Sequence, residues 1–334
     1  MRRVLIPAHV PTLAPLAPRA AQVVLGPVDT GVASLRGETM GTTWSVKAVT
    51  RIADDQLRPL IERCLSLVVA PMSQWESGSA LSRFYKAPAG SWHELPAEFA
   101  AVLHYALSLA RDTEGAYDPT LGALTELWGF GASGRRGNVP DVEAIEAARA
   151  CGGWQRVTFD RTRRAALQPG SVRLDLSSVA KGFAVDLVSE TLAWRGITDH
   201  LVEIGGELRG SGGKPDRTPW WVAIEEASDL VIALHGLSIA TSGDARRFIE
   251  QDGRKLSHTI DPRNGLPIAE DLAAVTVLNA SCMKADALAT ALSVLGADEG
   301  MRFARERGIA ARFVVRGAGG PIERMSPAFA EMLD

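Results

Sequence analysis

The chain has 334 residues, 46% of them hydrophobic and 22% charged, and a formal net charge of −3 at pH 7. This composition is typical of a soluble globular protein, and the nearly neutral charge gives no electrostatic basis for a nucleic-acid partner. The three cysteines, Cys64, Cys151 and Cys282, are widely spaced without a C-x-x-C pair, so neither a disulfide framework nor a zinc site is indicated.

The N-terminal segment is unusual because residues 4–18 carry no charge and follow Arg2 and Arg3. A signal peptide has such a pattern, but prolines at every third or fourth position are a poor basis for its helical segment. No uncharged run is long enough to span a bilayer. We expect residues 1–36 to be a proline-rich, poorly ordered leader before a folded domain at 37–334, and we favour a cytoplasmic location.

Hydrophobic periodicity predicts the elements of the first half. A strand is expected after a turn-like stretch, and Pro96 is expected to open a helix that ends near Gly115. A polar loop surrounds Trp75. In chain order the expected elements are a turn at 37–42, a strand at 43–49, a helix at 54–69, the loop at 72–79, the helix from Pro96, and a helix at 141–150.

The second half carries the densest pattern. Apolar residues recur at helical spacing from Ala180 to Leu192, with Gly196 placed to end the helix. Strands that arrive in pairs between occasional helices indicate an α+β fold with antiparallel sheets. Strands are expected at 171–176, 200–204, 207–210, 220–224, 237–241, 258–260, 274–278 and 312–315, and a further helix at 283–295.

The segment LDLSSVAKG at 174–182 runs from an expected strand directly into a helix. The free backbone amides of the helix start would lie beside Asp175, Ser178 and Lys181, which suits a phosphate or a metal-bound phosphate. The alternative is structural: a serine that caps the helix, a surface lysine and a structural aspartate.

Asp286 and Thr290 stand four residues apart in the segment KADALATA. On a helix this spacing points a carboxylate and a hydroxyl from one face, and the surrounding alanines let another backbone approach. Hard oxygen ligands of this kind could hold Mg²⁺ together with a carbonyl and phosphate oxygens. An aspartate and a threonine bonded within their own helix are the alternative.

His258 differs from the other histidines because it lies in a polar, turn-rich segment with Asp244 and Asp261 nearby in sequence. A histidine flanked by carboxylates suits general acid or base work. An aromatic and glycine-rich stretch, from Ala116 to Gly131, could form a wall for a flat ring system, although such stretches are more often packed loops.

Together these segments resemble the ApbE family of Mg²⁺-dependent FAD:protein FMN transferases. The similarity runs from Gly37 to about Gly300 in the family's order. It is carried by GETMGTTWSVK, MSQWESGSALSRF, AYDPTLGALTELWGFG, LDLSSVAKGFAVD, EIGGELRGSG, PWWVAIEE, IATSGDARRF, SHTIDPRNGLPI and ADALATALSVLG.

The resemblance implies a two-lobed α+β architecture, related to the T-fold, with FAD in a cleft between the lobes. It implies a metal held by the backbone oxygen of Ser178 with Asp286 and Thr290, and Ala289 close by. It also implies an FAD site lined by Met40, Trp75, Ala116, Tyr117, Asp118, Asp175, Lys181 and His258.

The implied reaction moves FMN from FAD onto a Ser or Thr hydroxyl of a target flavoprotein and releases AMP. Our candidate for accepting the hydroxyl proton is His258, with Asp244 as its partner. The chain has no S-G-A-[ST] acceptor sequence of the kind the family modifies, so the target is expected to be another chain. Two alternatives are an FAD pyrophosphatase that yields free FMN and AMP, and a non-catalytic flavin-binding protein.

Two departures from the family pattern are visible. Ala245 follows Asp244 where the family usually has an aromatic residue, so that wall of the site is expected to be more open. Family members are commonly exported, often as lipoproteins, which makes the periplasm the alternative location. Here the first cysteine is Cys64, so no cysteine follows the leader to take a lipid.

Overall fold

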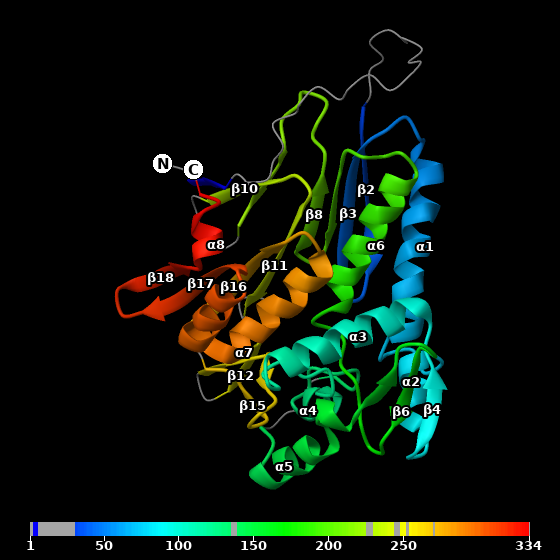
Figure 1. The fold of residues 1–334 in the computed structure, drawn as a ribbon, viewed down its shortest axis with the longest axis vertical. Coiled ribbons are helices and arrows are strands. Elements are labelled where there is room, and N and C mark those ends of the chain that lie inside the picture. The colour runs from blue at the N-terminus through cyan, green and yellow to red at the C-terminus, as the bar shows by residue number, and fades with distance from the viewer. Residues whose placement is uncertain are drawn as a thin grey trace.

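A computed structural model describes residues 3–5, 31–134, 139–224, 230–243, 248–251, 254–269 and 271–333 (Figure 1). At its centre is an eight-stranded sheet in the order β18-β17-β16-β11-β8-β7-β3-β2. Every neighbouring pair is antiparallel, which confirms the expected α+β class. The strands are β2 (Val32–Thr39), β3 (Thr42–Val49), β7 (His200–Ile204), β8 (Glu207–Ser211), β11 (Leu237–Gly243), β16 (Leu272–Asn279), β17 (Ala310–Gly317) and β18 (Gly320–Met325).

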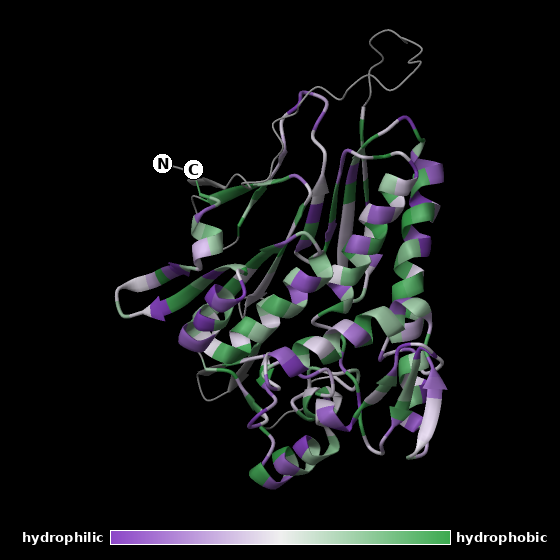
Figure 2. Cartoon of the chain, in the orientation of Figure 1, coloured by the Kyte–Doolittle hydropathy of each residue, from purple (hydrophilic) through white to green (hydrophobic). Residues whose placement is uncertain are grey.

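Long helices cover one face of this sheet (Figure 1). α6 packs on β7 and β8, α7 packs on β11 and β16, and α1 lies against both β2 and α6. Figure 2 shows hydrophobic and hydrophilic stretches alternating along α1, as expected for a helix with one buried stripe. The long helices are α1 (Asp54–Met72), α3 (Ala97–Asp112), α6 (Ala180–Trp194) and α7 (Cys282–Glu306).

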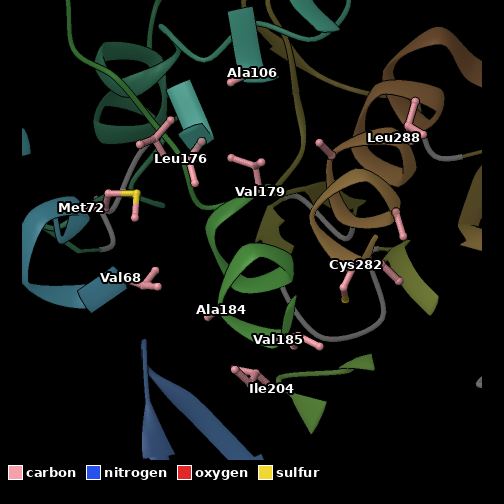
Figure 3. Packing of buried hydrophobic residues seen from close by; sticks show 14 of the residues in the cluster. Val68, Met72, Ala106, Leu176, Val179, Ala184, Val185, Ile204, Cys282 and Leu288 are labelled. Atoms are coloured by element: carbon pink, nitrogen blue, oxygen red, sulfur yellow. The ribbon is translucent and has the colours of Figure 1, made fainter. Parts of the chain in front are cut away.

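The core is continuous across these helices. In Figure 3, Val68 and Met72 of α1 lie on one side of α6, and Cys282 and Leu288 of α7 lie on the other. α6 is therefore covered on both flanks and against the sheet. Its position between two helices explains why apolar residues occur almost all round it.

α6 and α7 approach closely because one residue at their contact has no side chain. A Cβ atom added at Gly182 would overlap the carbonyl oxygen of Cys282 and lie 2.8 Å from the Cβ of Asp286. Only glycine fits there without a shift of one helix. The start of α6 is thereby held against the first turns of α7.

Smaller elements surround this centre. β1 (Arg3–Leu5), β10 (Leu230–Leu234) and β9 (Trp220–Ala223) form one small sheet, and β4 (Ser91–Glu94), β6 (Ala165–Gln168) and β5 (Thr158–Asp160) form another. Two hairpins are β12 (Phe248–Gln251) with β13 (Arg254–Ser257), and β14 (Ile260–Asp261) with β15 (Leu266–Pro267). The short helices are α2 (Ala80–Lys86), α4 (Gly122–Leu127), α5 (Val142–Cys151), α8 (Pro327–Ala330) and a 3-10 turn at Trp154–Arg156.

Most expected elements are confirmed, with some corrections. The strand expected at 171–176 is wrong: this stretch makes a single isolated parallel bridge, between Arg173 and Leu121, and pairs with no strand among the described residues. The turn expected at 37–42 is confined to Met40 and Gly41, since β2 continues to Thr39. β2 starts at Val32, so part of the segment expected as leader belongs to the sheet.

α7 is longer than expected and contains a break. It continues past Leu295 to Glu306, with Gly296 in a non-helical conformation at φ 78° and ψ 177°. Within the described part of the chain, no helix is both long and apolar enough to cross a membrane.

Candidate active site

The contact between α6 and α7 brings together two of the sequence motifs. Asp286 is buried on α7, and its Oδ2 accepts a hydrogen bond of 3.0 Å from the backbone amide of Gly182 on α6. Burial raises the pKa of the Asp286 carboxyl, and this effect is opposed by Lys181 and by the Gly182 amide. Thr290, partly buried, follows one helical turn after Asp286, and buried Ala289 lies beside it on the helix.

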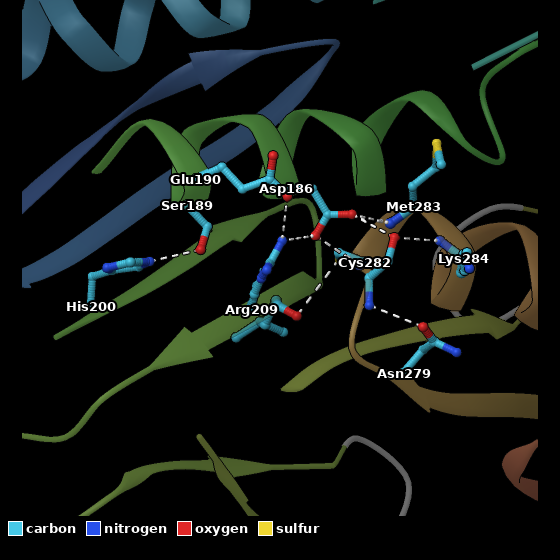
Figure 4. Close-up of polar contacts among 11 residues, drawn as sticks. Asp186, Ser189, Glu190, His200, Arg209, Asn279, Cys282, Met283 and Lys284 are labelled. Atoms are coloured by element: carbon cyan, nitrogen blue, oxygen red, sulfur yellow. Dashed lines mark hydrogen bonds and ion pairs between the residues drawn. The ribbon is translucent and has the colours of Figure 1, made fainter. Parts of the chain in front are cut away.

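A second carboxylate fixes the start of α7. Asp186 of α6 accepts hydrogen bonds from the backbone amides of Cys282 and Met283 and from the Ser281 hydroxyl, at 2.9, 3.0 and 2.7 Å. Arg209 of β8 contacts the same carboxylate at 2.6 Å (Figure 4). A negative charge at a helix N-terminus is favourable, so α7 is held in position by a sheet strand and by α6.

Tyr117 and Ser178 meet at the edge of this cluster. The Ser178 hydroxyl, in the turn before α6, donates to the Tyr117 hydroxyl at 3.2 Å. Burial raises the pKa of Tyr117 far above its ordinary value, with a further contribution from Asp286 and a smaller one from Asp175. Tyr117 is thus a neutral phenol whose surroundings include two of the predicted site carboxylates.

Asp118 is held by a local turn. Its carboxylate accepts from the Thr120 amide and hydroxyl, at 2.8 and 2.6 Å, and from the Trp154 amide at 3.1 Å. Burial raises the pKa of Asp118, while these hydrogen bonds act to lower it. Ala116 is buried two residues earlier, so the AYD segment offers mostly backbone atoms and one partly buried carboxylate.

Asp175 lies in the extended stretch before α6 and links it to α4. One oxygen accepts from the Ser177 amide and hydroxyl at 2.9 and 2.6 Å, and the other accepts from the Thr125 hydroxyl at 2.8 Å. Thr125 belongs to α4, a short helix that sequence periodicity did not predict. This carboxylate therefore joins two motifs that are 50 residues apart in the chain.

Lys181 is paired with a residue to which sequence reasoning assigned no role. Its Nζ lies 2.5 Å from Oε1 of Glu207, the first residue of β8. Burial raises the pKa of Glu207 to about 7, an effect that Lys181 opposes and Asp286 adds to. The one feature of the sequence that could have drawn attention to Glu207 is its place directly after two glycines in the segment EIGGELRG.

His258 lies between β13 and β14, beside the aromatic stretch. Its ring meets Phe130 edge to face, with a centroid separation of 6.2 Å. The Trp128 indole N–H donates to the carbonyl of Gly265 at 2.9 Å, which ties the end of α4 to the loop after His258. Asp244, the expected partner of His258, falls outside the described residues, as does Ala245.

Met40 and Trp75 lie on loops, and Met40 packs against the main hydrophobic core. Met40 occupies the β2–β3 turn with φ 50°, a conformation uncommon for a residue with a side chain. Trp75 is 60% exposed, in the loop between α1 and α2. An aromatic ring that open is available to stack on a flat ligand.

A hollow of about 520 Å³ opens beside Asp118. Charged side chains line much of it, among them Glu146, Arg149 and Arg263, and Trp154 forms part of its wall. Asp118 is the one predicted site residue in that lining, so the α6–α7 cluster stands apart from this hollow.

The oxygen donors of the α6–α7 cluster fit a magnesium ion. Asp286 supplies a buried carboxylate and Thr290 a hydroxyl on the same helix face, and Ser178 lies in the turn that leads into α6, whose Gly182 amide contacts Asp286. Among the described residues, no group of three or more His, Cys, Asp or Glu side chains could hold an ion. An ion here depends on one carboxylate, neutral oxygens and ligand phosphates, a combination that Mg²⁺ commonly uses.

The ApbE family model matches residues 40–313, which include every candidate site residue named in this subsection. The chain belongs to the ApbE family.

ApbE relatives cover nearly the whole chain. The FAD:protein FMN transferase of Haemophilus influenzae is 37% identical over 92% of this chain and 93% of its own length. The Vibrio cholerae protein of the same name is 39% identical over 90% of this chain and 92% of its own length. The apo crystal structure of the Pseudomonas stutzeri flavinyl transferase ApbE superposes with a TM-score of 0.85 at 41% identity, covering 90% of this chain and 96% of that one.

Proposed function

We propose that this ApbE protein transfers FMN from FAD to a Ser or Thr hydroxyl of a target flavoprotein, with Mg²⁺ as cofactor and AMP as the second product. The names of its relatives support transfer of FMN from FAD to protein. The observation that carries the proposal is the meeting of Lys181, Asp286 and the Gly182 amide where α6 contacts α7. A cation, a carboxylate and a helix start in one place suit a diphosphate with its metal.

The reaction exchanges the phosphoanhydride bond of FAD for a phosphoester bond to the acceptor. The acceptor oxygen bonds to the FMN phosphorus, the bond between that phosphorus and the oxygen bridging to AMP breaks, and the hydroxyl proton leaves to a base. A bound Mg²⁺ supplies charge neutralisation on the phosphate oxygens. Ser178, Asp286 and Thr290 would hold it, with Ala289 giving room at the helix face.

The remaining roles, which are diphosphate binding, proton acceptance and FAD binding, are assigned to side chains of this chain. Lys181 places its ammonium group against the diphosphate, and His258 accepts the proton of the acceptor hydroxyl. Asp244 is the proposed partner of His258. Binding of FAD is assigned to Met40, Trp75, Ala116, Tyr117, Asp118 and Asp175, where exposed Trp75 offers a stacking surface and the hollow beside Asp118 offers room for one end of the dinucleotide.

The test is a transfer assay with the purified chain, FAD, Mg²⁺ and a peptide bearing an S-G-A-[ST] sequence. The expected result is a peptide heavier by one FMN, together with an equal amount of AMP. Free FMN in place of labelled peptide would identify an FAD pyrophosphatase, and flavin binding without AMP would identify a binding protein. Either result would overturn the proposal. A peptide with alanine at the acceptor position is the matched control.

A further inference from the structure

Glu207 is more deeply buried than Lys181, its ion-pair partner. The side chain of Glu207 is 5% exposed and that of Lys181 is 29% exposed, and the two meet at 2.5 Å. The lysine is therefore the more accessible of the two to a ligand from solvent.

The hairpin between β7 and β8 places Glu207 in this position. Gly205 and Gly206 form the turn with φ of 65° and 107°, values that favour glycine. Residues two apart on a strand share a face, so Glu207 and Arg209 point the same way. Both contact α6: Glu207 through Lys181, and Arg209 through Asp186.

The Glu207 carboxylate is only half satisfied. Oε1 accepts from Lys181, whereas Oε2 is buried and has no hydrogen-bond partner among the described residues. A carboxylate buried in this way is a poor means of stabilising a fold, because the loss of hydration offsets much of the attraction to its partner. The contact that this buried carboxylate does make is with Lys181.

A lysine ammonium is a point charge on a flexible four-carbon stem, and a fixed partner restricts where it can lie. We propose that Glu207 is a positioning residue, which holds the ammonium of Lys181 at the place where the diphosphate of FAD binds. This inference rests on the proposed function, because it takes FAD as the ligand of Lys181. Glu207 itself touches neither FAD nor the reacting atoms.

The sign of one mutational effect separates positioning from simple electrostatics. Glu207→Gln keeps the size of the side chain and, at the pH values above the Glu207 pKa where binding is measured, removes a negative charge near the bound diphosphate. Coulomb's law alone then predicts tighter binding of anionic FAD. Loss of positioning predicts that FAD binds more weakly, by about tenfold or more. The reason is that the charge-assisted contact between the Lys181 ammonium and the diphosphate would be poorly placed.

The experiment is a double-mutant cycle with Glu207→Gln, Lys181→Met and the double variant. FAD binding is measured in Mg²⁺ by flavin fluorescence, and FMN transfer is measured with the acceptor peptide. We expect Glu207→Gln to weaken FAD binding in the wild-type background and to add nothing in the Lys181→Met background. Glu203→Gln is the matched control, since Glu203 bonds the amide of Gly206 in the same turn but contacts Ser45 instead of α6.

Each outcome decides the inference. Tighter or unchanged FAD binding by Glu207→Gln, or an equal loss in both backgrounds, would overturn it. Should Glu207→Gln not fold, Glu207→Asp, which withdraws the carboxylate by one methylene, is expected to weaken binding, and unchanged binding would be a refutation. A wild-type chain that binds FAD without transferring FMN would refute the proposed function, while the binding cycle would still decide the role of Glu207.

Discussion

The Asp286 carboxylate accepts a hydrogen bond from the Gly182 amide at 3.0 Å, across the closest approach of α6 and α7. That amide lies at the start of α6, where backbone donors lack partners within the helix. The carboxylate completes the helix start, and the helix start orients the carboxylate. The fold and the proposed metal site therefore depend on the same contact.

Replacement of Gly182 by alanine is expected to destabilise the fold and to impair the proposed metal site. The added methyl would overlap the Cys282 carbonyl and press on Asp286, so the free energy of unfolding should fall by about 1–3 kcal/mol or more. FMN transfer should fall further than stability alone explains. Denaturant unfolding and the transfer assay measure these effects. Gly319→Ala is the control, because no atom lies within 4 Å of the Cβ it would add. Equal behaviour of the two variants would contradict the expectation.

Asp286→Asn is expected to lower Mg²⁺-dependent transfer by at least about 100-fold, because the metal's only protein carboxylate in the proposed site is lost. Raising the Mg²⁺ concentration should restore part of the activity. Asp298→Asn, on the same helix with a side chain 93% exposed, should behave as wild type. Initial rates against Mg²⁺ concentration provide the measurement. Full activity of Asp286→Asn would remove the metal assignment.

His258→Gln is expected to reduce kcat by about 10²–10⁴-fold if the histidine accepts the acceptor proton. Binding of FAD should change much less, so the loss should appear in kcat more than in KM. His235→Gln serves as control, since that ring bonds the Gly212 carbonyl in another part of the molecule. An increase in KM with kcat unchanged would instead assign His258 to substrate binding.

Asp186→Asn should destabilise the fold by about 1–3 kcal/mol, because three donors at the start of α7 and Arg209 lose a charged acceptor. Glu190→Gln is the matched control: Glu190 contacts the same Arg209 at 3.3 Å, but its side chain is 62% exposed. Such exposed pairs contribute little. Thermal and denaturant unfolding compare the two, and similar small losses would show that Asp186 is not the anchor of α7.

Buried His200 should make the protein less stable as pH falls. Its Nδ1–H donates to the Ile197 carbonyl at 2.9 Å, and its Nε2 accepts from the Ser189 hydroxyl at 2.7 Å. Burial lowers the pKa of His200 below its ordinary value of about 6.5, with a smaller lowering by Arg209 that Ile197 and Asp199 oppose. Around and below that ordinary value the unfolded chain binds more protons than the folded one, so this group's stabilisation is lost with acidification.

The measurement for His200 is the free energy of unfolding at several pH values between 7.5 and 5.5, for wild type and for His200→Gln. The difference between the two curves isolates this histidine from the buried carboxylates, whose raised pKa values act in the opposite direction. The wild-type curve should fall more steeply toward low pH. Parallel curves would show that His200 takes up its proton equally in both states.

Sequence reasoning located the long elements because their signals are local. The apolar repeat from Ala180 to Leu192 predicted α6 within two residues at its C-terminal end. The strand expected at 171–176 failed because a strand needs a neighbour, and periodicity does not say whether one is present. α4 was missed because a six-residue helix is too short to show a period.

The proposed site residues were assigned by resemblance more than by pattern. Asp286 and Thr290 could be paired from helical spacing alone, as one face of a helix. The pairing of Lys181 with Glu207, and the link from Asp175 to Thr125, join residues from separate elements. Such contacts depend on how the sheet and helices pack, which a single sequence does not reveal.

The bond between Gly182 and Asp286 spans 104 residues of chain. Contacts of such long range form only after the intervening segment has closed its loop, and they tend to appear late in folding. During synthesis, β7, β8, β11 and β16 must leave the ribosome before α7 does, because they precede it in the chain. A nascent chain of this protein therefore stays without its proposed metal site until most of the sheet has been made, so partly synthesised molecules should not consume FAD.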